Sequence, residues 1–138
     1  MSRDWDWQRA TAIAVGGSSG AALRWAVVTS VDVGRFPWPV LVINIAGSLL
    51  LGILLAEEWS NPSMRLLVHD AGGIGFCGGL TTFSTFSLEV VNLARDGDFA
   101  LALLYLVASV AGAVVGLVAG AGVLRRVRAV TLPLEEKP

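Results

Sequence analysis

Long apolar stretches without charged residues dominate the hydropathy pattern of this chain. Three of them, residues 36–56, 71–88 and 99–124, contain 21, 18 and 26 residues without Asp, Glu, Lys or Arg. A helix needs ~20 apolar residues to cross the hydrocarbon core of a bilayer. The pattern therefore predicts three membrane-spanning helices before any motif is considered.

An additional span is predicted at the N-terminal side, over residues 10–31, and it is the first of four along the chain. It is rich in glycine and serine and carries one charged residue, Arg24. A cleaved signal peptide is the alternative. The preceding residues 1–9 disfavour it, because two acidic residues accompany the two arginines there, unlike a basic n-region. We expect Trp5 and Trp7 to lie at the membrane interface as aromatic anchors.

Together these spans predict an all-α integral membrane protein of four transmembrane helices in a single domain, residues 1–138. The expected spans are residues 10–31, 38–56, 66–93 with a break at 77–82, and 99–124, followed by a polar C-terminal tail over 125–138. Glycine and proline in the short connections are typical of turns between helices.

The composition excludes several other classes of protein. Apolar residues make up 54% of the chain and charged residues only 15%, whereas soluble domains carry roughly 25% charged residues. No run of like charge suggests a nucleic-acid partner. The single cysteine, Cys77, cannot form an intramolecular disulfide and is expected to pack in the core. The single histidine, His69, adjoins the third span beside Asp70, so no nucleophilic triad can be assembled and we expect no enzyme.

Small residues recur every four positions in the last span, at Ala108, Gly112, Gly116 and Gly120. Residues four apart share one helical face, and small residues let membrane helices approach closely. The pattern predicts a tight contact with another helix. Four short helices enclose little volume, so a solute path would form more easily between two chains, and we expect an oligomer.

The positive residues near the span ends indicate an orientation. Seven Lys and Arg residues lie on the side that holds both termini and the connection between the second and third spans, and two lie on the other side. The seven are Arg3, Arg9, Arg65, Arg125, Arg126, Arg128 and Lys137, and the two are Arg35 and Arg95. The positive-inside rule then predicts both termini in the cytoplasm.

The third span is unusual for a helix in lipid. Residues 70–87 hold five glycines and five hydroxyl residues. Glycine weakens a helix by ~1 kcal/mol relative to alanine, and a break in the helix frees carbonyl groups that hydrocarbon cannot satisfy. We therefore expect a break within residues 77–82 that lines a protein site, because transporters use such freed groups to bind ions.

Two aromatic residues follow the break on one helical face, Phe83 and Phe86, with Glu89 three positions further on. Packing is the simpler interpretation of this spacing. The alternative is an anion path, since aromatic rings have a positive edge and conduction requires weak, repeated binding.

Polar pairs in two other spans offer hydrogen-bond donors. Asn44 and Ser48 are four apart in the second span, and Tyr105 and Ser109 in the fourth. Hydrogen bonding between helices is one interpretation, and donation to a passing anion is the other. Arg24 is the one cation within a predicted span. It is either paired or functional within the membrane, or its side chain extends to the membrane interface.

The block GFCGGLTTFSTF at residues 75–86, together with Asn44 and Arg24, resembles the Fluc/CrcB family of fluoride channels over about residues 13–124. The resemblance implies a four-helix protein of the bacterial plasma membrane that pairs as an antiparallel, dual-topology dimer. It also implies two fluoride pores and a structural sodium ion at the dimer centre that is not transported.

The resemblance also assigns residues by their match to the family block. The sodium ligands would be the backbone carbonyls of Gly78 and Thr81, two from each subunit. The fluoride pore residues would be Asn44, Phe83, Phe86, Tyr105 and Ser109, with Arg24, Ser48, Thr82 and Ser84 in supporting positions. The chain departs from some relatives at Gly112 and Ala113, where a hydroxyl track would continue.

These observations predict a fluoride-specific passive channel that exports fluoride and lowers its cytoplasmic concentration. A chain that inserts both ways should show little charge bias, so the count of seven to two leaves a homodimer and a heterodimer with a homologous chain both open. A proton-coupled multidrug exporter is the rival, but it needs a carboxylate in the first span, and residues 10–31 contain none. A purely structural membrane subunit would explain the glycines but not the donors.

Overall fold

The computed structural model describes residues 7–31, 34–56 and 61–131, and these residues form helices without any strand. Their order is α1 (Trp7–Ser30), α2 (Trp38–Leu55), α3 (Pro62–Met64), η1 (Arg65–Cys77), α4 (Gly78–Leu80), α5 (Phe83–Arg95) and α6 (Phe99–Thr131). The all-α prediction is confirmed for this part of the chain.

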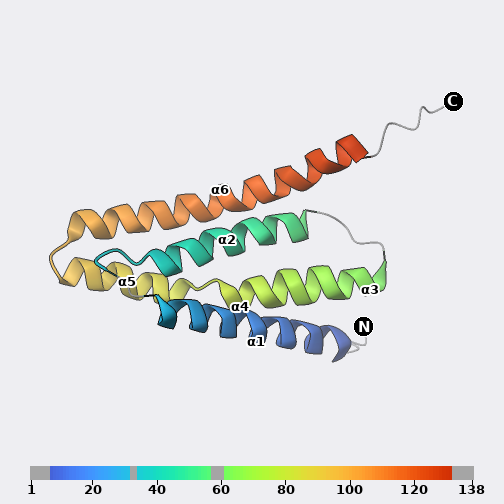
Figure 1. Cartoon of the computed structure of the whole chain (residues 1–138), viewed down its shortest axis with the longest axis horizontal. Helices are drawn as coiled ribbons and strands as arrows, with labels where there is room; N and C mark the ends of the chain where they lie inside the picture. The colour runs from blue at the N-terminus through green and yellow to red at the C-terminus, as the bar shows by residue number, and fades with distance from the viewer. Residues whose placement is uncertain (1–6, 32–33, 57–60, 132–138) are drawn as a thin grey trace, which may run out of the picture.

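The helices lie side by side as rods (Figure 1). Helices α3, η1, α4 and α5 follow one another along the third rod, between α1 on one side and α2 on the other, and α6 lies along α2. The start of α1, the end of α2 and the end of α6 share one end of the molecule, and the turn between α5 and α6 lies at the other (Figure 1). Among the described residues, Arg9 and Arg65 lie in helical segments that begin at the first end, whereas Arg95 lies at the end of α5, beside the turn.

Three of the rods are long and apolar enough to cross a membrane: α2, the third rod from Pro62 to Arg95, and α6 up to Arg126. The protein is therefore a membrane protein by helix length and composition. Helix α1 has a suitable length of 24 residues, but Arg9, Arg24 and its many small residues keep it outside this apolar class. The span predicted over residues 10–31 is thus present as helix α1, which packs against the third rod.

Two predicted boundaries need correction. Helix α6 continues to Thr131, so the first part of the predicted polar tail, 125–138, is helical; the chain from 132 onward, like Trp5, lies outside the described residues. The predicted break at 77–82 is narrower in the structure, because α4 keeps the chain helical through Leu80. Apolar hydropathy sets the length of a membrane span, whereas a helix ends only where its backbone bonds end.

The third rod differs from an ordinary α-helix before its break. Segment η1 is a π-helix of 13 residues, a wider form with i→i+5 hydrogen bonds that usually occurs as a single turn near functional sites. Gly75 in η1 has no room for a side chain, since an added Cβ would lie 2.6 Å from the carbonyl oxygen of Ile13 in α1. The glycines of this rod therefore serve close contact with α1.

The predicted small-residue face of α6 packs on α2. A Cβ on Gly120 would lie 2.1 Å from the carbonyl oxygen of Leu49, and a Cβ on Gly112 would lie 2.6 Å from the side chain of Ile45. Only glycine permits this separation of the two backbones. The prediction of a tight helix contact at this face is confirmed.

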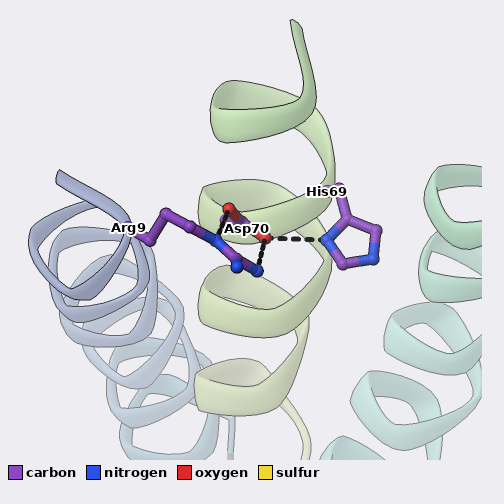
Figure 2. Close-up of polar contacts among 3 residues, drawn as sticks. All are labelled: Arg9, His69 and Asp70. Atoms are coloured by element: carbon purple, nitrogen blue, oxygen red, sulfur yellow. Dashed lines mark hydrogen bonds and ion pairs between the residues drawn. The ribbon is translucent and has the colours of Figure 1, made fainter. Parts of the chain in front are cut away.

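A partly buried ion pair joins α1 to η1 (Figure 2). Arg9 Nε and Nη2 donate to the two carboxylate oxygens of Asp70 at 2.7 and 3.2 Å, and His69 Nδ1 lies 2.7 Å from Asp70 Oδ1. The Asp70 side chain is only 1% exposed. An ionised carboxylate can only accept, so the histidine donates through Nδ1. Asp70 is therefore held from both sides.

An aromatic and aliphatic core lies at the opposite half of the bundle, between α2, α5 and α6. Tyr105 and Val40 are completely buried there, and Phe86 and Leu93 are nearly so. The ring of Phe36 meets Tyr105 edge to face at 5.4 Å. This core fixes the orientation of α5, the helix that follows the break.

Candidate functional site

The break in the third rod consists of two residues in extended conformation. Thr81 has φ −77° and ψ 154°, and Thr82 has φ −147° and ψ 124°. Thr82 then caps α5, since its hydroxyl accepts a hydrogen bond from the Thr85 N–H at 3.2 Å, as threonine commonly does at a helix start. Before the break the rod packs against α1, and after it α5 packs against α6. The break lets one rod change partners.

The break frees the carbonyl groups of Gly78 and Thr81 from their helical donors. In an unbroken helix these carbonyls would accept from the N–H groups of Thr82 and Thr85. Thr82 N–H donates instead to Asn44 Oδ1 at 2.8 Å, and Thr85 N–H donates to the Thr82 hydroxyl. The two carbonyls predicted as sodium ligands are thus among those that the break releases.

Two side chains from neighbouring helices bind the interrupted backbone. Asn44 in α2 accepts from Thr82 N–H and also donates from Nδ2 to the Thr82 carbonyl at 3.1 Å. Arg24 in α1 donates from Nη1 to the Thr81 carbonyl at 3.0 Å. The structural interpretation of Asn44 is therefore correct, and Arg24 has a partner inside the bundle.

An open cleft of about 340 Å³ lies beside the break, between α2, α5 and α6. It is lined by Asn44, Ser48, Leu51, Thr81, Thr82, Phe83, Phe86, Ser109, Val110, Ala113 and Val114. Most of the residues that the sequence analysis selected in three separate spans therefore come together around one space. Gly78, Arg24, Ser84 and Tyr105 are not part of this lining.

The two phenylalanines of the cleft differ in burial. Phe83 is 80% exposed, whereas Phe86 is 8% exposed and packs against Tyr105 with ring centroids 5.6 Å apart. The centroids of Phe83 and Phe86 are 5.8 Å apart, with the rings tilted by 52°. Both rings line the cleft, but the packing interpretation holds only for Phe86 within this chain.

The two hydroxyls of the fourth span also differ. Tyr105 is completely buried behind the cleft, and its hydroxyl donates to the carboxylate of Glu89. Ser109 is 4% exposed, and its Oγ has no hydrogen-bond partner among the described residues. A buried hydroxyl without a partner costs free energy. Ser109 lies one turn from Tyr105, whose hydroxyl is the nearby polar group, and places a hydroxyl at the wall of the cleft.

Gly78, which begins α4 just before the break, faces open space. It is exposed, and nothing lies within 4 Å of a Cβ built on it. A neutral carbonyl oxygen is a suitable ligand for a hard cation, so the freed carbonyls of Gly78 and Thr81 fit a sodium ion in their chemistry. Arg24 brings a positive charge to the second of these oxygens.

Several residues of the site were not selected from the sequence. Leu51, Val110 and Val114 supply apolar lining, and nothing distinguished them from the other aliphatic residues of their spans. Thr85 supports the cap of α5. Glu89 shares the helical face of the two phenylalanines, and that spacing was the available signal for its contact with the buried Tyr105.

Comparison with known proteins gives consistent matches. The family model described as "CrcB-like protein, Camphor Resistance (CrcB)" matches residues 11–121. The chain is 42% identical over 123 residues to the "Fluoride-specific ion channel FluC" of Novosphingobium aromaticivorans, covering 83% of this chain and 94% of the relative. It is 41% identical over 128 residues to the "Fluoride-specific ion channel FluC 1" of Nitrobacter hamburgensis, covering 86% of this chain and 97% of that protein. The "Fluoride-specific ion channel FluC" of Bordetella avium is 43% identical over 101 residues, covering 73% of this chain and 80% of that protein.

Proposed function

The chain belongs to the CrcB family, and from this membership we propose that it is a fluoride-specific channel that lets fluoride leave the cell passively. The family is one of ion channels and not of enzymes. The observation that carries the proposal for this chain is the cleft beside the break, where the amide of Asn44 and the hydroxyl of Ser109 stand within a mostly apolar wall.

Fluoride is small and strongly hydrated, so a path through a membrane must replace its water with hydrogen-bond donors. The Ser109 hydroxyl has no partner among the described residues. Asn44 uses one N–H of its amide on the Thr82 carbonyl, and the amide has a second N–H. These two donors come from different helices and line the same cleft. They support passage of an anion rather than a cation.

The lining also avoids full charges. Within the described part of the chain, no Lys, Arg, Asp or Glu is among the residues that form the cleft. A full positive charge would bind fluoride too tightly to release it, whereas conduction needs sites that bind the ion weakly enough for it to leave. The positive edges of Phe83 and Phe86 provide such weak sites along the wall.

The cleft is open in a single chain, which supports a dimer. Phe83 is 80% exposed, and the valines beside it on α6, Val110 and Val114, are 53% and 57% exposed. These side chains would contact lipid if the chain stood alone. A second copy inserted in the opposite orientation would cover them and close a path on each side of the contact. A homologous partner chain would serve equally, and heterodimerisation is one outcome of the test.

Gly78 and Thr81 would hold a sodium ion between the subunits through their carbonyls. The ion would supply a fixed positive charge that joins the two broken rods and would not be transported. Gly78 supports this arrangement because it is exposed and a Cβ built on it would meet no atom within 4 Å. Asn44 then keeps the break open by holding both polar groups of the Thr82 backbone.

Passive conduction is sufficient for export from a bacterial cell. Hydrogen fluoride is a weak acid that crosses the bilayer in neutral form and dissociates inside. A membrane potential contributes ~2.3 kcal/mol per elementary charge per 100 mV, which favours anion exit by about 50-fold. A channel in the plasma membrane therefore lowers cytoplasmic fluoride without a coupled ion.

Fluoride efflux from liposomes tests the proposal. The chain, purified alone, is reconstituted with internal potassium fluoride, and valinomycin is added without a pH gradient. We expect rapid fluoride efflux and much slower chloride efflux under the same conditions. Efflux that requires a proton gradient would favour an exchanger instead. Absence of efflux from this chain alone, with efflux restored by a homologous chain, would replace the homodimer by a heterodimer.

A further inference from the structure

Arg24 places a full positive charge on the interrupted backbone at the centre of the bundle. Its Nη1 donates to the carbonyl oxygen of Thr81 at 3.0 Å, and its side chain is half-buried between α1 and the third rod. The ion pairs within the described residues use Arg9, Arg35 and His69 as their cationic groups. Arg24 therefore rests on a neutral oxygen, with no carboxylate among those residues to balance its charge.

The Thr81 carbonyl is the oxygen that a sodium ion between the subunits would need. The side chain of Thr81 makes other contacts. Its hydroxyl donates to the Cys77 carbonyl at 2.9 Å, and its methyl group occupies the space beside Gly47. A carbonyl oxygen has two lone pairs. It can accept the guanidinium N–H and approach a metal ion, but both partners are positively charged.

Two unit charges on one oxygen repel strongly in this setting. The guanidinium and the ion would lie within about 5 Å of each other, where the effective dielectric constant near protein groups is ~20 rather than 80. At this separation and dielectric constant, the repulsion weakens binding of the ion by about 100-fold or more relative to a neutral donor at the same position. The same guanidinium would occupy the oxygen whenever the ion is absent.

We propose that Arg24 and the sodium ion compete for the Thr81 carbonyl, so that Arg24 sets the sodium concentration at which the paired form becomes stable. This inference rests on the proposed sodium site. Arg24 acts through the carbonyl and is a positioning residue, not a group on the fluoride path. In the absence of sodium its guanidinium keeps the freed carbonyl hydrogen-bonded inside the bundle.

A sodium titration of dimer formation tests the competition without measuring flux. Full-length protein in detergent is titrated with sodium chloride against N-methylglucamine chloride at constant ionic strength, and the crosslinked dimer fraction and melting temperature are measured. Arg24→Gln keeps an amide donor and removes the charge. We expect its sodium midpoint to fall by about tenfold or more. Arg24→Lys keeps the charge, and its midpoint should stay within about threefold of the wild type.

Arg95→Gln is the matched control, because it removes the same charge from the far end of α5. Its midpoint should equal that of the wild type. A midpoint that is unchanged or higher in Arg24→Gln, with sodium dependence intact in the wild type, overturns the competition but leaves the sodium site standing. Sodium dependence in neither protein overturns both. Sodium dependence that appears only in Arg24→Gln supports the competition.

A measurement on the wild type covers the case in which Arg24→Gln does not fold. Protein labelled with ¹⁵N-arginine is compared in sodium and in N-methylglucamine, and the Arg24 side-chain resonance is assigned by its absence from Arg24→Lys. We expect this resonance to shift on sodium addition while that of Arg95 does not. An Arg24 resonance that is identical in both salts contradicts the proposal.

Discussion

The side-chain amide of Asn44 in α2 is hydrogen-bonded in both directions to the main chain of Thr82, where the third rod is interrupted. Thr82 is 8% exposed, so neither backbone group can turn to water without a rearrangement. Asn44 thus replaces the helical acceptor that the Thr82 N–H loses at the break, and it adds a second donor to the Thr82 carbonyl. Because Asn44 both stabilises the break and lines the adjacent cleft, its replacement affects the fold and the proposed fluoride path together.

Replacement of Asn44 should therefore reduce both stability and flux. Asn44→Ala leaves the buried Thr82 N–H unpaired and removes the side-chain donor to the Thr82 carbonyl, which should cost about 1–3 kcal/mol and lower fluoride efflux at least tenfold. Thermal unfolding in detergent and liposome efflux measure the two effects. Ser48→Ala, on the same face of α2, is the control and should leave stability unchanged. Wild-type stability in Asn44→Ala would show that water satisfies the break.

The two phenylalanines should separate packing from conduction. Phe83→Ile should not change stability, because Phe83 is 80% exposed, whereas Phe86→Ile should cost about 1 kcal/mol through its lost contact with Tyr105. Both should suppress fluoride efflux while the crosslinked dimer remains. Undiminished efflux in both variants would remove the aromatic wall from the proposed path.

Ser109 offers a test in which function and stability move apart. Ser109→Ala removes a buried hydroxyl without a partner among the described residues, so stability should stay the same or rise by up to ~1 kcal/mol. Fluoride efflux should fall about tenfold because a donor leaves the cleft. Ser18→Ala on the exposed face of α1 is the control. A clear loss of stability in Ser109→Ala would mean that the hydroxyl has a structural partner.

Two ion pairs of equal length should differ in their contribution to stability. Arg9–Asp70 and Arg35–Asp98 both measure 2.7 Å, but Asp70 is 1% exposed and Asp98 is 26% exposed. Arg9→Ala leaves a carboxylate buried and should cost about 2 kcal/mol, near the low end for buried pairs because Arg9 itself is 43% exposed. Arg35→Ala should change the unfolding free energy by less than ~0.5 kcal/mol. Equal losses in thermal unfolding would contradict this ranking.

Two glycines near the end of α6 should respond oppositely to alanine. A Cβ at Gly120 would meet the Leu49 carbonyl at 2.1 Å, whereas a Cβ at Gly122 meets nothing within 4 Å. Gly120→Ala should push α6 from α2 and lower stability by more than ~2 kcal/mol. Gly122→Ala should raise it by up to ~1 kcal/mol through helix propensity. Chemical denaturation of the two variants compares them directly, and a tolerated Gly120→Ala would place the helices further apart.

The local sequence determined the helices, the interruption and the tight contact of α6. Charge-free length limits where a chain can cross a bilayer, and glycines every four residues define a face whatever surrounds them. The cluster of glycines and hydroxyl residues after Asp70 similarly indicated a break, because such residues do not suit a helix in lipid. Each of these conclusions depends on neighbours in the chain, so each could be reached without coordinates.

Only the tertiary structure decided which polar side chains meet. Asn44, Arg24 and Ser109 carry the same kind of signal in the sequence, a polar side chain in a mostly apolar span. In the folded chain the first two bind the main chain of the third rod, and the third has no partner among the described residues. Those fates depend on the rotation of one helix against another. Periodicity in a single helix fixes its own faces but not the residue that each face will meet.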